Sequence, residues 1–227
     1  MTTLFITGID TDIGKSIACG ALAKALIESG HHVFTQKLIE TGCANVESAD
    51  LATHQRIVGK TFNTGTPEQH CPYTFSYPAS PHLAAQREAK TIDCDYLSRQ
   101  IKTLEQQCEH LLIEGAGGLC VPLNQETQII DFIAEDNFPI VLVTSAKLGS
   151  INHTLLSLAA CQQQKIEVRA IIYNHYGQDE QAIIEDTRSV LQAHIQDQQT
   201  KPLWLELEAG EQQIAMTQET IKRLLSN

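Results

Sequence analysis

The chain has 227 residues, of which 42% are hydrophobic, and its formal net charge is −11. This length and apolar content suit one α/β domain spanning residues 1–227, because no linker rich in Gly, Ser or Pro divides the chain. The acidic balance argues against nucleic acid as a partner, because nucleic-acid phosphates need a basic face, but it allows a small phosphorylated ligand.

Composition also bears on the cellular compartment. No apolar run approaches the ~18 residues of a membrane span, and the first residues lack the basic region and apolar core of a signal peptide. The seven cysteines include no C-x-x-C pair, so we expect reduced thiols in a cytoplasmic protein. The nine histidines include His31-His32, but none has the i, i+4 spacing beside a glutamate that marks a zinc helix, so we expect no structural zinc site.

The first predicted elements surround a glycine-bounded loop. Residues 3–8 are apolar and β-rich, and an amphipathic helical pattern follows from about residue 15 to residue 29. Gly14-Lys15-Ser16 opens this helix. Strand, loop and helix start in this order predict a phosphate-binding loop, in which backbone N–H groups face the anion, Lys15 adds positive charge and Ser16 can bind Mg²⁺. Five residues, rather than the usual four, separate Gly8 from Gly14.

Strands and helices alternate along the rest of the chain. Further strands are predicted at residues 32–36, 110–113, 139–144, 168–173 and 202–207, and helices at about 48–58, 83–90, 93–108, 150–164, 178–193 and 211–225. Residues 71–75 and 78–82 are interpreted as a loop interrupted by prolines. The alternation predicts an α/β fold of the P-loop NTPase type, with a doubly wound, mainly parallel sheet and helices on both faces.

Polar side chains follow several of the predicted strands. Lys37 and Thr41 come after the strand at 32–36, and Glu114 and Asn174 each follow another strand. In open α/β sheets ligands gather beyond the carboxyl ends of the strands, so we expect these side chains near the phosphate of the first loop. For Lys37 the alternative is an ordinary surface lysine. For Asp50, in the first turn of a predicted helix, the alternative is an N-cap or a helix-dipole acid.

Several motifs occur together in a specific order. They are residues 8–16 with their five-residue gap, Lys37, Pro72-Tyr73-Thr74-Phe75, Ser80-Pro81-His82, Glu114-Gly115-Ala116-Gly117-Gly118, residues 147–153 and Asn174. This set resembles the dethiobiotin synthetases of biotin biosynthesis, and the resemblance covers residues 3 to about 175. Each motif alone is modest, but their joint order is specific.

The resemblance implies a homodimeric P-loop ligase that uses ATP, Mg²⁺ and CO₂, with an active site shared between two subunits. Its substrate is 7,8-diaminononanoate. One amine captures CO₂ as a carbamate, the carbamate attacks the γ-phosphate of ATP to give a carbamic–phosphoric anhydride, and the second amine closes the ring of dethiobiotin and expels phosphate. Negative charge develops near the γ-phosphate, so this chemistry needs preorganised cations and hydrogen-bond donors.

The resemblance also assigns roles to individual residues. The catalytic positions correspond to Lys15, Lys37 and Thr11. The Mg²⁺ positions correspond to Ser16, Asp50 and Glu114, whose oxygens suit this ion. The nucleotide positions correspond to Asp12, Ile13, Gly14, Lys15, Ser16, Ile17, Asp50, Glu114, Gly115, Ala116, Gly117, Asn174, His175, Leu203, Trp204 and Leu205. The substrate positions correspond to Lys37, Thr41, Gly118, Ser150 and Asn152, of which the last two begin a helix that the family's second subunit supplies to bind the tail carboxylate.

The sequence departs from the family pattern at several points. Leu38 stands where the family commonly has proline, Thr41 where it commonly has serine, and Ser16 where threonine is commoner. Thr41 keeps a hydroxyl but adds a methyl group near the diamine. Leu203-Trp204-Leu205 lacks the usual glycine and proline of the late nucleotide loop, so the sequence does not define the base contacts there.

Two other interpretations stay open. Dimeric P-loop ATPases of the partitioning or nitrogenase iron-protein type carry a second lysine five residues before the Gly-Lys-Ser lysine, where this chain has Asp10, and cluster-binding cysteines are not evident. A nucleotide-binding protein without catalysis would be expected to have lost Lys15, Lys37, Asp50 or Glu114, and all four are present. Both interpretations are therefore less favoured than a dethiobiotin synthetase.

Overall fold

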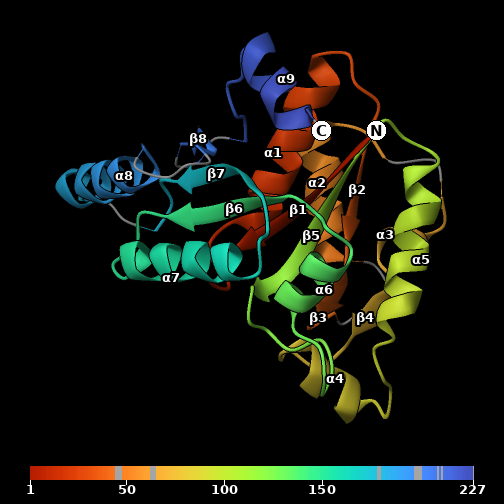
Figure 1. Ribbon diagram of the computed structural model, residues 1–227. Coiled ribbons are helices and arrows are strands. Elements are labelled where there is room, and N and C mark those ends of the chain that lie inside the picture. The colour runs from red at the N-terminus through yellow and green to blue at the C-terminus, as the bar shows by residue number, and fades with distance from the viewer. Residues whose placement is uncertain are drawn as a thin grey trace.

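A parallel sheet forms the centre of the computed structural model, which describes residues 1–43, 48–61, 65–177, 180–196, 201–208, 210 and 212–226 (Figure 1). The strand order is β2-β5-β1-β6-β7-β8, and each neighbouring pair is parallel. The strands are β1 (Thr2–Gly8), β2 (Val33–Lys37), β5 (His110–Gly118), β6 (Ile140–Ser145), β7 (Val168–Asn174) and β8 (Leu203–Leu207). This sheet and its helices confirm the predicted fold class.

Helices cover both faces of the sheet (Figure 1). They are α1 (Lys15–Glu28), α2 (Ala49–Val58), α3 (Pro67–His70), α4 (Pro81–Arg87), α5 (Cys94–Glu105), α6 (Ile129–Glu135), α7 (Ser150–Gln163), α8 (Gln181–Gln196) and α9 (Gln218–Leu225). Successive strand residues point to opposite faces, so Leu4 and Ile6 share one core with α1 and α9, while Phe5 shares the other with α5, α6 and α7. Two buried faces explain why the middles of β1, β5 and β6 are unbroken apolar runs rather than alternating patterns.

A second, two-stranded parallel sheet was not predicted. It pairs β3 (Ile39–Thr41) with β4 (Tyr73–Phe75), and Thr41 lies opposite Phe75. The interpretation of residues 71–75 as loop was therefore wrong for Tyr73–Phe75. Three-residue strands are too short to show a period of two, and their partner lies far away in the sequence. Helix α6 was also missed. The expected helix starts at residues 178 and 211 lie outside the described residues.

The carboxyl ends of the strands meet at one edge of the large sheet. In the strand register Lys37 lies opposite Glu114, and Asn174 lies opposite Leu207. The register therefore brings together the polar strand-end residues that the sequence had placed separately along the chain.

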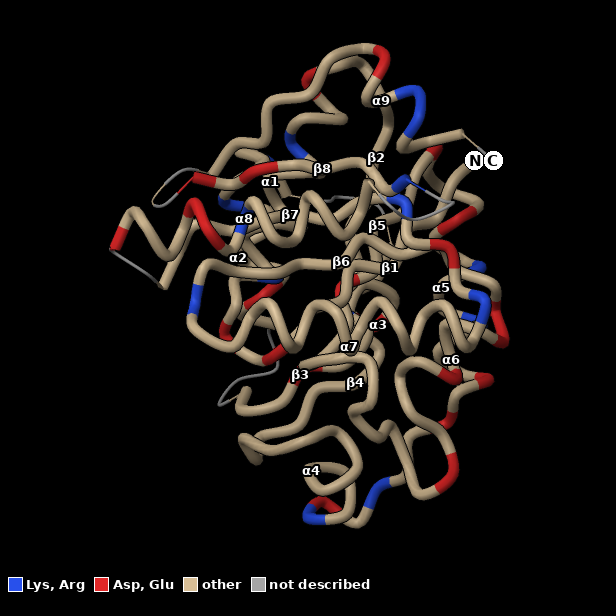
Figure 2. The backbone as a smooth tube through the Cα atoms, turned by 60° about the vertical axis from the view of Figure 1, so that its left-hand side comes forward, with Lys and Arg blue, Asp and Glu red and all other residues tan. Residues whose placement is uncertain are grey.

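Two surface features bear on partners. Within the described part of the chain, no helix has the length and apolar character needed to cross a membrane. Figure 2 shows the lysine and arginine positions scattered among more numerous acidic ones, in keeping with the net charge of −11.

Candidate active site

A cavity of about 870 Å³ opens at the carboxyl ends of the strands. Its walls come from the loop after β1, the ends of β2, β5 and β7, the small sheet, and the start of α2. Most of the residues predicted for the site line this cavity: Thr11, Asp12, Gly14, Lys15, Ser16, Ile17, Lys37, Thr41, Asp50, Glu114, Ala116, Gly117 and Asn174.

The loop after β1 is held in shape by glycine and by Asn174. Gly14 has φ 87°, in the left-handed region, and a Cβ atom there would lie 2.3 Å from Asn174 Nδ2. The same Asn174 amide donates a hydrogen bond to the carbonyl of Ile13 at 2.8 Å. Asn174 is buried, so the end of β7 fastens the loop in the conformation from which α1 begins at Lys15. The N–H groups of that helix start face a prospective anion.

Lys15 is buried although it carries charge. Its side chain is 6% exposed, and Nζ donates a hydrogen bond to the carbonyl of Asp10 at 2.8 Å. Burial, followed by the positive charge of Lys37, lowers the pKa of Lys15. An anion between the two ammonium groups would relieve this repulsion, so the loop is electrostatically prepared for phosphate.

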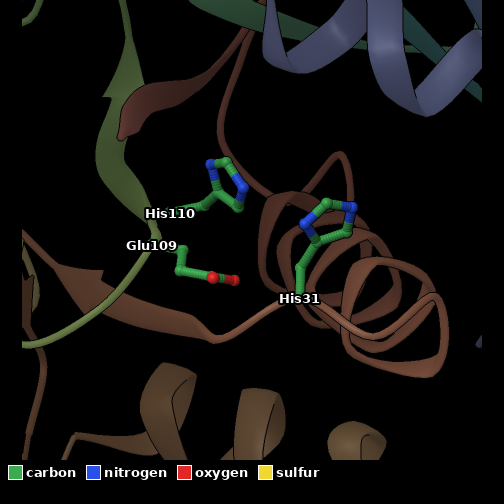
Figure 3. A group of neighbouring side chains, drawn as sticks. All are labelled: His31, Glu109 and His110. Carbon is green, nitrogen blue, oxygen red and sulfur yellow. The ribbon is translucent and has the colours of Figure 1, made fainter.

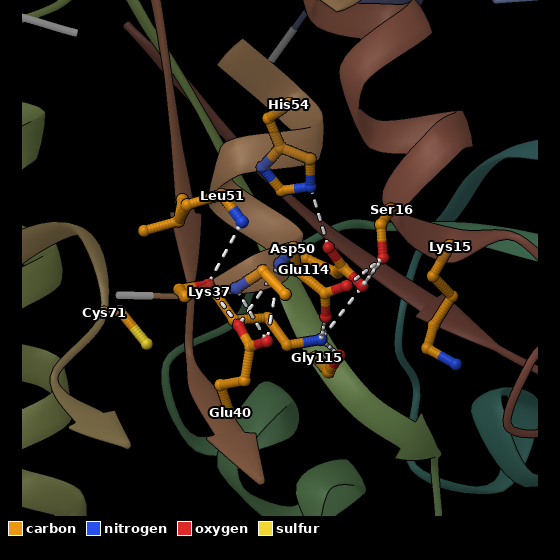
Figure 4. A network of polar contacts seen from close by, with 12 residues as sticks. Lys15, Ser16, Lys37, Glu40, Asp50, Leu51, His54, Cys71, Glu114 and Gly115 are labelled. Atoms are coloured by element: carbon orange, nitrogen blue, oxygen red, sulfur yellow. Dashed lines mark hydrogen bonds and ion pairs between the residues drawn. The ribbon is translucent and has the colours of Figure 1, made fainter. Parts of the chain in front are cut away.

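Lys37 is the centre of a buried ion network (Figure 4). Its ammonium group lies 2.5 Å from Asp50 Oδ2, 2.9 Å from Glu114 Oε1 and 3.1 Å from the carbonyl of Gly115. Ser16 Oγ lies 2.6 Å from Asp50 Oδ1 and 3.0 Å from Glu114 Oε1. Asp50 and Glu114 therefore each contact both Ser16 and the predicted catalytic lysine, so the three residues predicted to bind Mg²⁺ lie around one point.

Glu114 stays ionised despite being 1% exposed. Burial raises the pKa of its carboxyl group, but Lys37 and then His54 more than offset this and hold the pKa well below its usual range. His54 Nε2 lies 2.8 Å from Glu114 Oε2, and its Nδ1 lies 3.0 Å from Thr35 Oγ1. The site therefore combines the carboxyl groups of Asp50 and Glu114 with the hydroxyl of Ser16. This is the hard-oxygen donor set that Mg²⁺ prefers, so the residues fit that ion.

Two buried residues of this network were missed by sequence reasoning. His54 lies four residues after Asp50 on α2, a spacing that places both on one helix face and could have indicated it. Glu40 gave no such signal. Its carboxylate accepts hydrogen bonds from Ser48 Oγ, from the backbone N–H of Ala49 at 2.9 Å and from that of Asp50 at 3.4 Å. Glu40 thereby fixes the start of the helix that carries both Asp50 and His54.

The remaining predicted residues lie beside the cavity or away from it. Leu203, Trp204 and Leu205 are the first three residues of β8, where Trp204 stacks on Tyr173. They do not line the cavity. The part of this segment that lines it is Leu207, at the end of β8, followed by Glu208, Gly210 and Gln212. His175 lies next to this segment, 2.9 Å from Glu206 and 3.3 Å from Glu208. Ile13 is buried beneath the phosphate loop, and Gly118 lies opposite Gly8 in the sheet.

The two residues predicted to serve a second subunit differ in exposure. Ser150 is 3% exposed, its hydroxyl lies 3.0 Å from Ser145 Oγ, and its N–H donates to the carbonyl of Lys147. Asn152, two residues into α7, is exposed. Only Asn152 is therefore placed to reach another chain with its side chain.

Replacing Glu40 by alanine is expected to lower stability and to raise the Mg²⁺ concentration needed for half-maximal activity. The start of α2 loses its acceptor, and unpaired buried polar groups cost roughly 1–3 kcal/mol. Urea unfolding and a Mg²⁺ titration measure the two effects. Glu88→Ala is the matched control, because Glu88 accepts similar bonds from Ser76 N and Oγ far from the cavity. An unchanged Mg²⁺ titration for Glu40→Ala would show that Glu40 does not position Asp50.

Comparison with known proteins places this site in a family. A family model described as "AAA domain" matches residues 2–200. The ATP-dependent dethiobiotin synthetase BioD 2 of Haemophilus ducreyi is 48% identical over 197 residues, which are 85% of this chain and 91% of that protein. The ATP-dependent dethiobiotin synthetase BioD of Chlorobaculum tepidum is 44% identical over 84% of this chain and 80% of its own.

Solved structures share the fold at low sequence identity. The pNOB8 ParA structure, solved with nonspecific DNA, has a TM-score of 0.56 and 11% identity, and the match covers 92% of this chain and 86% of that one. At this identity the likeness concerns the fold alone. It therefore does not favour the interpretation as a partitioning ATPase. The interpretation as a dethiobiotin synthetase has the support of relatives that are 44% and 48% identical.

Proposed function

The chain belongs to the ATP-dependent dethiobiotin synthetases, ligases of biotin biosynthesis, and we propose that it converts 7,8-diaminononanoate, CO₂ and ATP to dethiobiotin, ADP and phosphate. The observation that carries this proposal is a network of contacts beside the phosphate loop. In it Asp50 and Glu114 each contact both Lys37 and Ser16. Two lysines and two carboxylates at one cavity suit a reaction that gathers negative charge on a phosphoryl group.

We propose the following bond changes. One substrate amine adds to CO₂ and loses a proton, giving a carbamate. A carbamate oxygen forms a bond to the γ-phosphorus of ATP as the bond to the ADP oxygen breaks. The second amine then attacks the carbamoyl carbon, the carbon–oxygen bond to phosphate breaks, and the ureido ring closes with loss of a proton.

The protein contributes charge and position to these steps. Lys15 and Lys37 hold the negative oxygens, and Thr11, on the exposed part of the phosphate loop, offers a further donor. Thr41, which lines the cavity next to Glu40, would contact the diamine. Ser16, Asp50 and Glu114 would hold Mg²⁺, which when bound supplies positive charge to the phosphates.

An assay with ATP, Mg²⁺, bicarbonate and 7,8-diaminononanoate tests the proposal. Phosphate release and a cyclic urea product should appear together and should both require the diamine. ATP hydrolysis that proceeds equally without the diamine would instead favour an ATPase of the partitioning type. Nucleotide binding without any turnover would favour the non-catalytic interpretation.

Substitution at Thr41 is expected to alter the affinity for the diamine. Thr41→Ser should keep the Michaelis constant or lower it, because the hydroxyl remains and a methyl group is removed. Thr41→Val should raise it, since an unpaired polar group in a closed site costs roughly 1–3 kcal/mol. Steady-state kinetics at saturating ATP measure the three values. Equal Michaelis constants for all three proteins would show that position 41 does not contact the diamine.

We further propose a homodimer in which the start of α7 completes the partner's active site. Leu148 is 80% exposed and Leu156 is 61% exposed, so large apolar side chains lie on this surface beside Asn152. A second copy of the chain would bury them. The tail carboxylate of the diamine would then meet the N-terminal end of α7 from the other subunit.

Subunit mixing tests the shared site. Lys15→Ala disables the phosphate loop, and Asn152→Glu places a negative charge where the tail carboxylate should bind. Each homodimer should be nearly inactive, and randomly exchanged mixtures should recover up to about a quarter of wild-type activity, because half the dimers are mixed and each has one intact site of two. Asn152 serves better than Ser150, because glutamate at the buried Ser150 would disturb the fold. Proven exchange without recovery would contradict the proposal.

A further inference from the structure

A second group of ligating side chains lies at the opposite end of the sheet from the cavity. His110 begins β5, where it lies opposite Thr2 of β1 and Val33 of β2. Glu109 precedes it, and His31 stands in the connection between α1 and β2. One ligand atom from each of His31, Glu109 and His110 lies within 4.8 Å of the others. Figure 3 shows the two imidazole rings and the carboxylate around the same space.

The backbone holds the segments that carry these side chains. The N–H groups of Glu109 and His110 both donate to the carbonyl of His32, at 2.9 and 3.2 Å. In return the N–H of His32 donates to Glu109 Oε2 at 2.8 Å. The N–H of His31 donates to the carbonyl of Leu26, which ties it to the end of α1. The three ligating residues are thus supported by regular structure, and a bound ion would need little further ordering.

His110 has an unsatisfied nitrogen. Its Nδ1 is buried and has no hydrogen-bond partner among the described residues. Its ring lies 5.0 Å from that of His31, edge to face. Burial, and then the neighbouring His31, lower the pKa of His110, which favours the neutral imidazole that binds metal ions. A buried unpaired nitrogen normally costs about 1–3 kcal/mol, and a ligand at this position would remove that cost.

We propose that His31, Glu109 and His110 form a binding site for Zn²⁺ or a similar late first-row divalent cation. Two imidazoles and a carboxylate are a ligand set that zinc uses with water in the remaining position, and imidazole ligands favour this class of ion over Mg²⁺. The bound ion would link the connection after α1 to the start of β5. Its effect is on stability, because it lies at the end of the sheet remote from the phosphate loop.

Among the residues that the structure describes, one further group of this kind occurs, and it is a poorer site. His175, Glu206 and Glu208 also approach one another, but both nitrogens of His175 already contact carboxylates, at 2.9 and 3.3 Å. Arg188 lies 3.8 Å from Glu206 and adds a positive charge that opposes a cation. We therefore assign the ion to His31, Glu109 and His110.

To test the proposal, the full chain is treated with a chelator and its binding of Co²⁺ and Zn²⁺ is measured. Excess Mg²⁺ is present throughout, so that the oxygen ligands of Ser16, Asp50 and Glu114 are occupied. Co²⁺ should give visible absorption bands that saturate at one ion per chain and that Zn²⁺ abolishes. Zn²⁺ should also raise the melting temperature of the wild type. His31→Gln and His110→Gln should each weaken Co²⁺ binding by at least about tenfold, the lower range for losing a group that supports a metal.

Two controls identify the site. His32→Gln alters the adjacent exposed histidine, whose ring packs on Phe34, and should bind Co²⁺ like the wild type. His175→Gln should do the same. Because His31 is only partly buried, His31→Gln keeps the test valid if His110→Gln fails to fold. Wild-type binding that is absent, or that survives in a folded His31→Gln protein, overturns the proposal, and the dethiobiotin assay is not involved in either outcome.

Discussion

Lys37→Ala is expected to lower the turnover number by about 10²–10⁵-fold, the range seen when a cation or donor at a transferring phosphoryl group is removed. The ammonium group of Lys37 is buried and contacts Asp50, Glu114 and the carbonyl of Gly115. Single-turnover kinetics with saturating Mg²⁺ and ATP would show the loss in the chemical step.

Two measurements separate this effect from unfolding. Lys37→Ala leaves Asp50 and Glu114 without their shared cation, so the melting temperature should also fall, but the protein should still bind ATP through the phosphate loop. Lys24→Ala, on the surface of α1, is the control and should be nearly wild type in both respects. A folded Lys37→Ala protein with near-normal turnover would remove Lys37 from the catalytic machinery.

Glu114→Gln should have the largest combined effect on stability and metal dependence. Glu114 is 1% exposed and contacts Lys37, His54 and Ser16. Removing its charge leaves Lys37 and His54 facing an amide, and breaking a buried ion pair costs about 3–5 kcal/mol. Urea unfolding should show that loss, and the Mg²⁺ titration should shift to higher concentration.

The variant Asp50→Asn should separate the effect on stability from the effect on the Mg²⁺ requirement. The Asp50 side chain is 29% exposed, so its loss should cost less stability than that of Glu114 while still raising the Mg²⁺ requirement. If both variants kept the wild-type Mg²⁺ dependence, Asp50 and Glu114 would not be metal ligands. Their contacts with Lys37 would then be structural.

The sequence predicted the large sheet well because its signals are local. Apolar runs, the Gly14-Lys15-Ser16 helix start and the polar residues at strand ends each lie within a few positions of one another. The doubly wound topology then follows from the alternation of strands and helices. Lys37 and Glu114 meet because the parallel register places them opposite each other. Asp50 joins them from the first turn of α2.

The features that were missed depend on contacts between distant segments. Glu40 acts by accepting bonds from the start of α2, and the pairing of β3 with β4 joins two segments of three residues each. His31 gives no metal signal by spacing, because the side chains beside it in the fold come from the start of β5. Leu203, Trp204 and Leu205 were assigned to nucleotide positions because Trp204 matched a family tryptophan, whereas they lie in β8, where Trp204 packs on Tyr173.

The central position of β1 sets an order for folding during synthesis. Its Thr2 lies opposite His110 of β5, and its Gly8 lies opposite Val143 of β6. The ribosome makes β1 long before either neighbour, so this apolar strand stays unpaired until residues 110–143 have emerged. Long-range parallel pairing of this kind is slow and exposes the chain to aggregation. The phosphate loop, encoded near the start, is therefore among the last parts of the molecule to become able to bind.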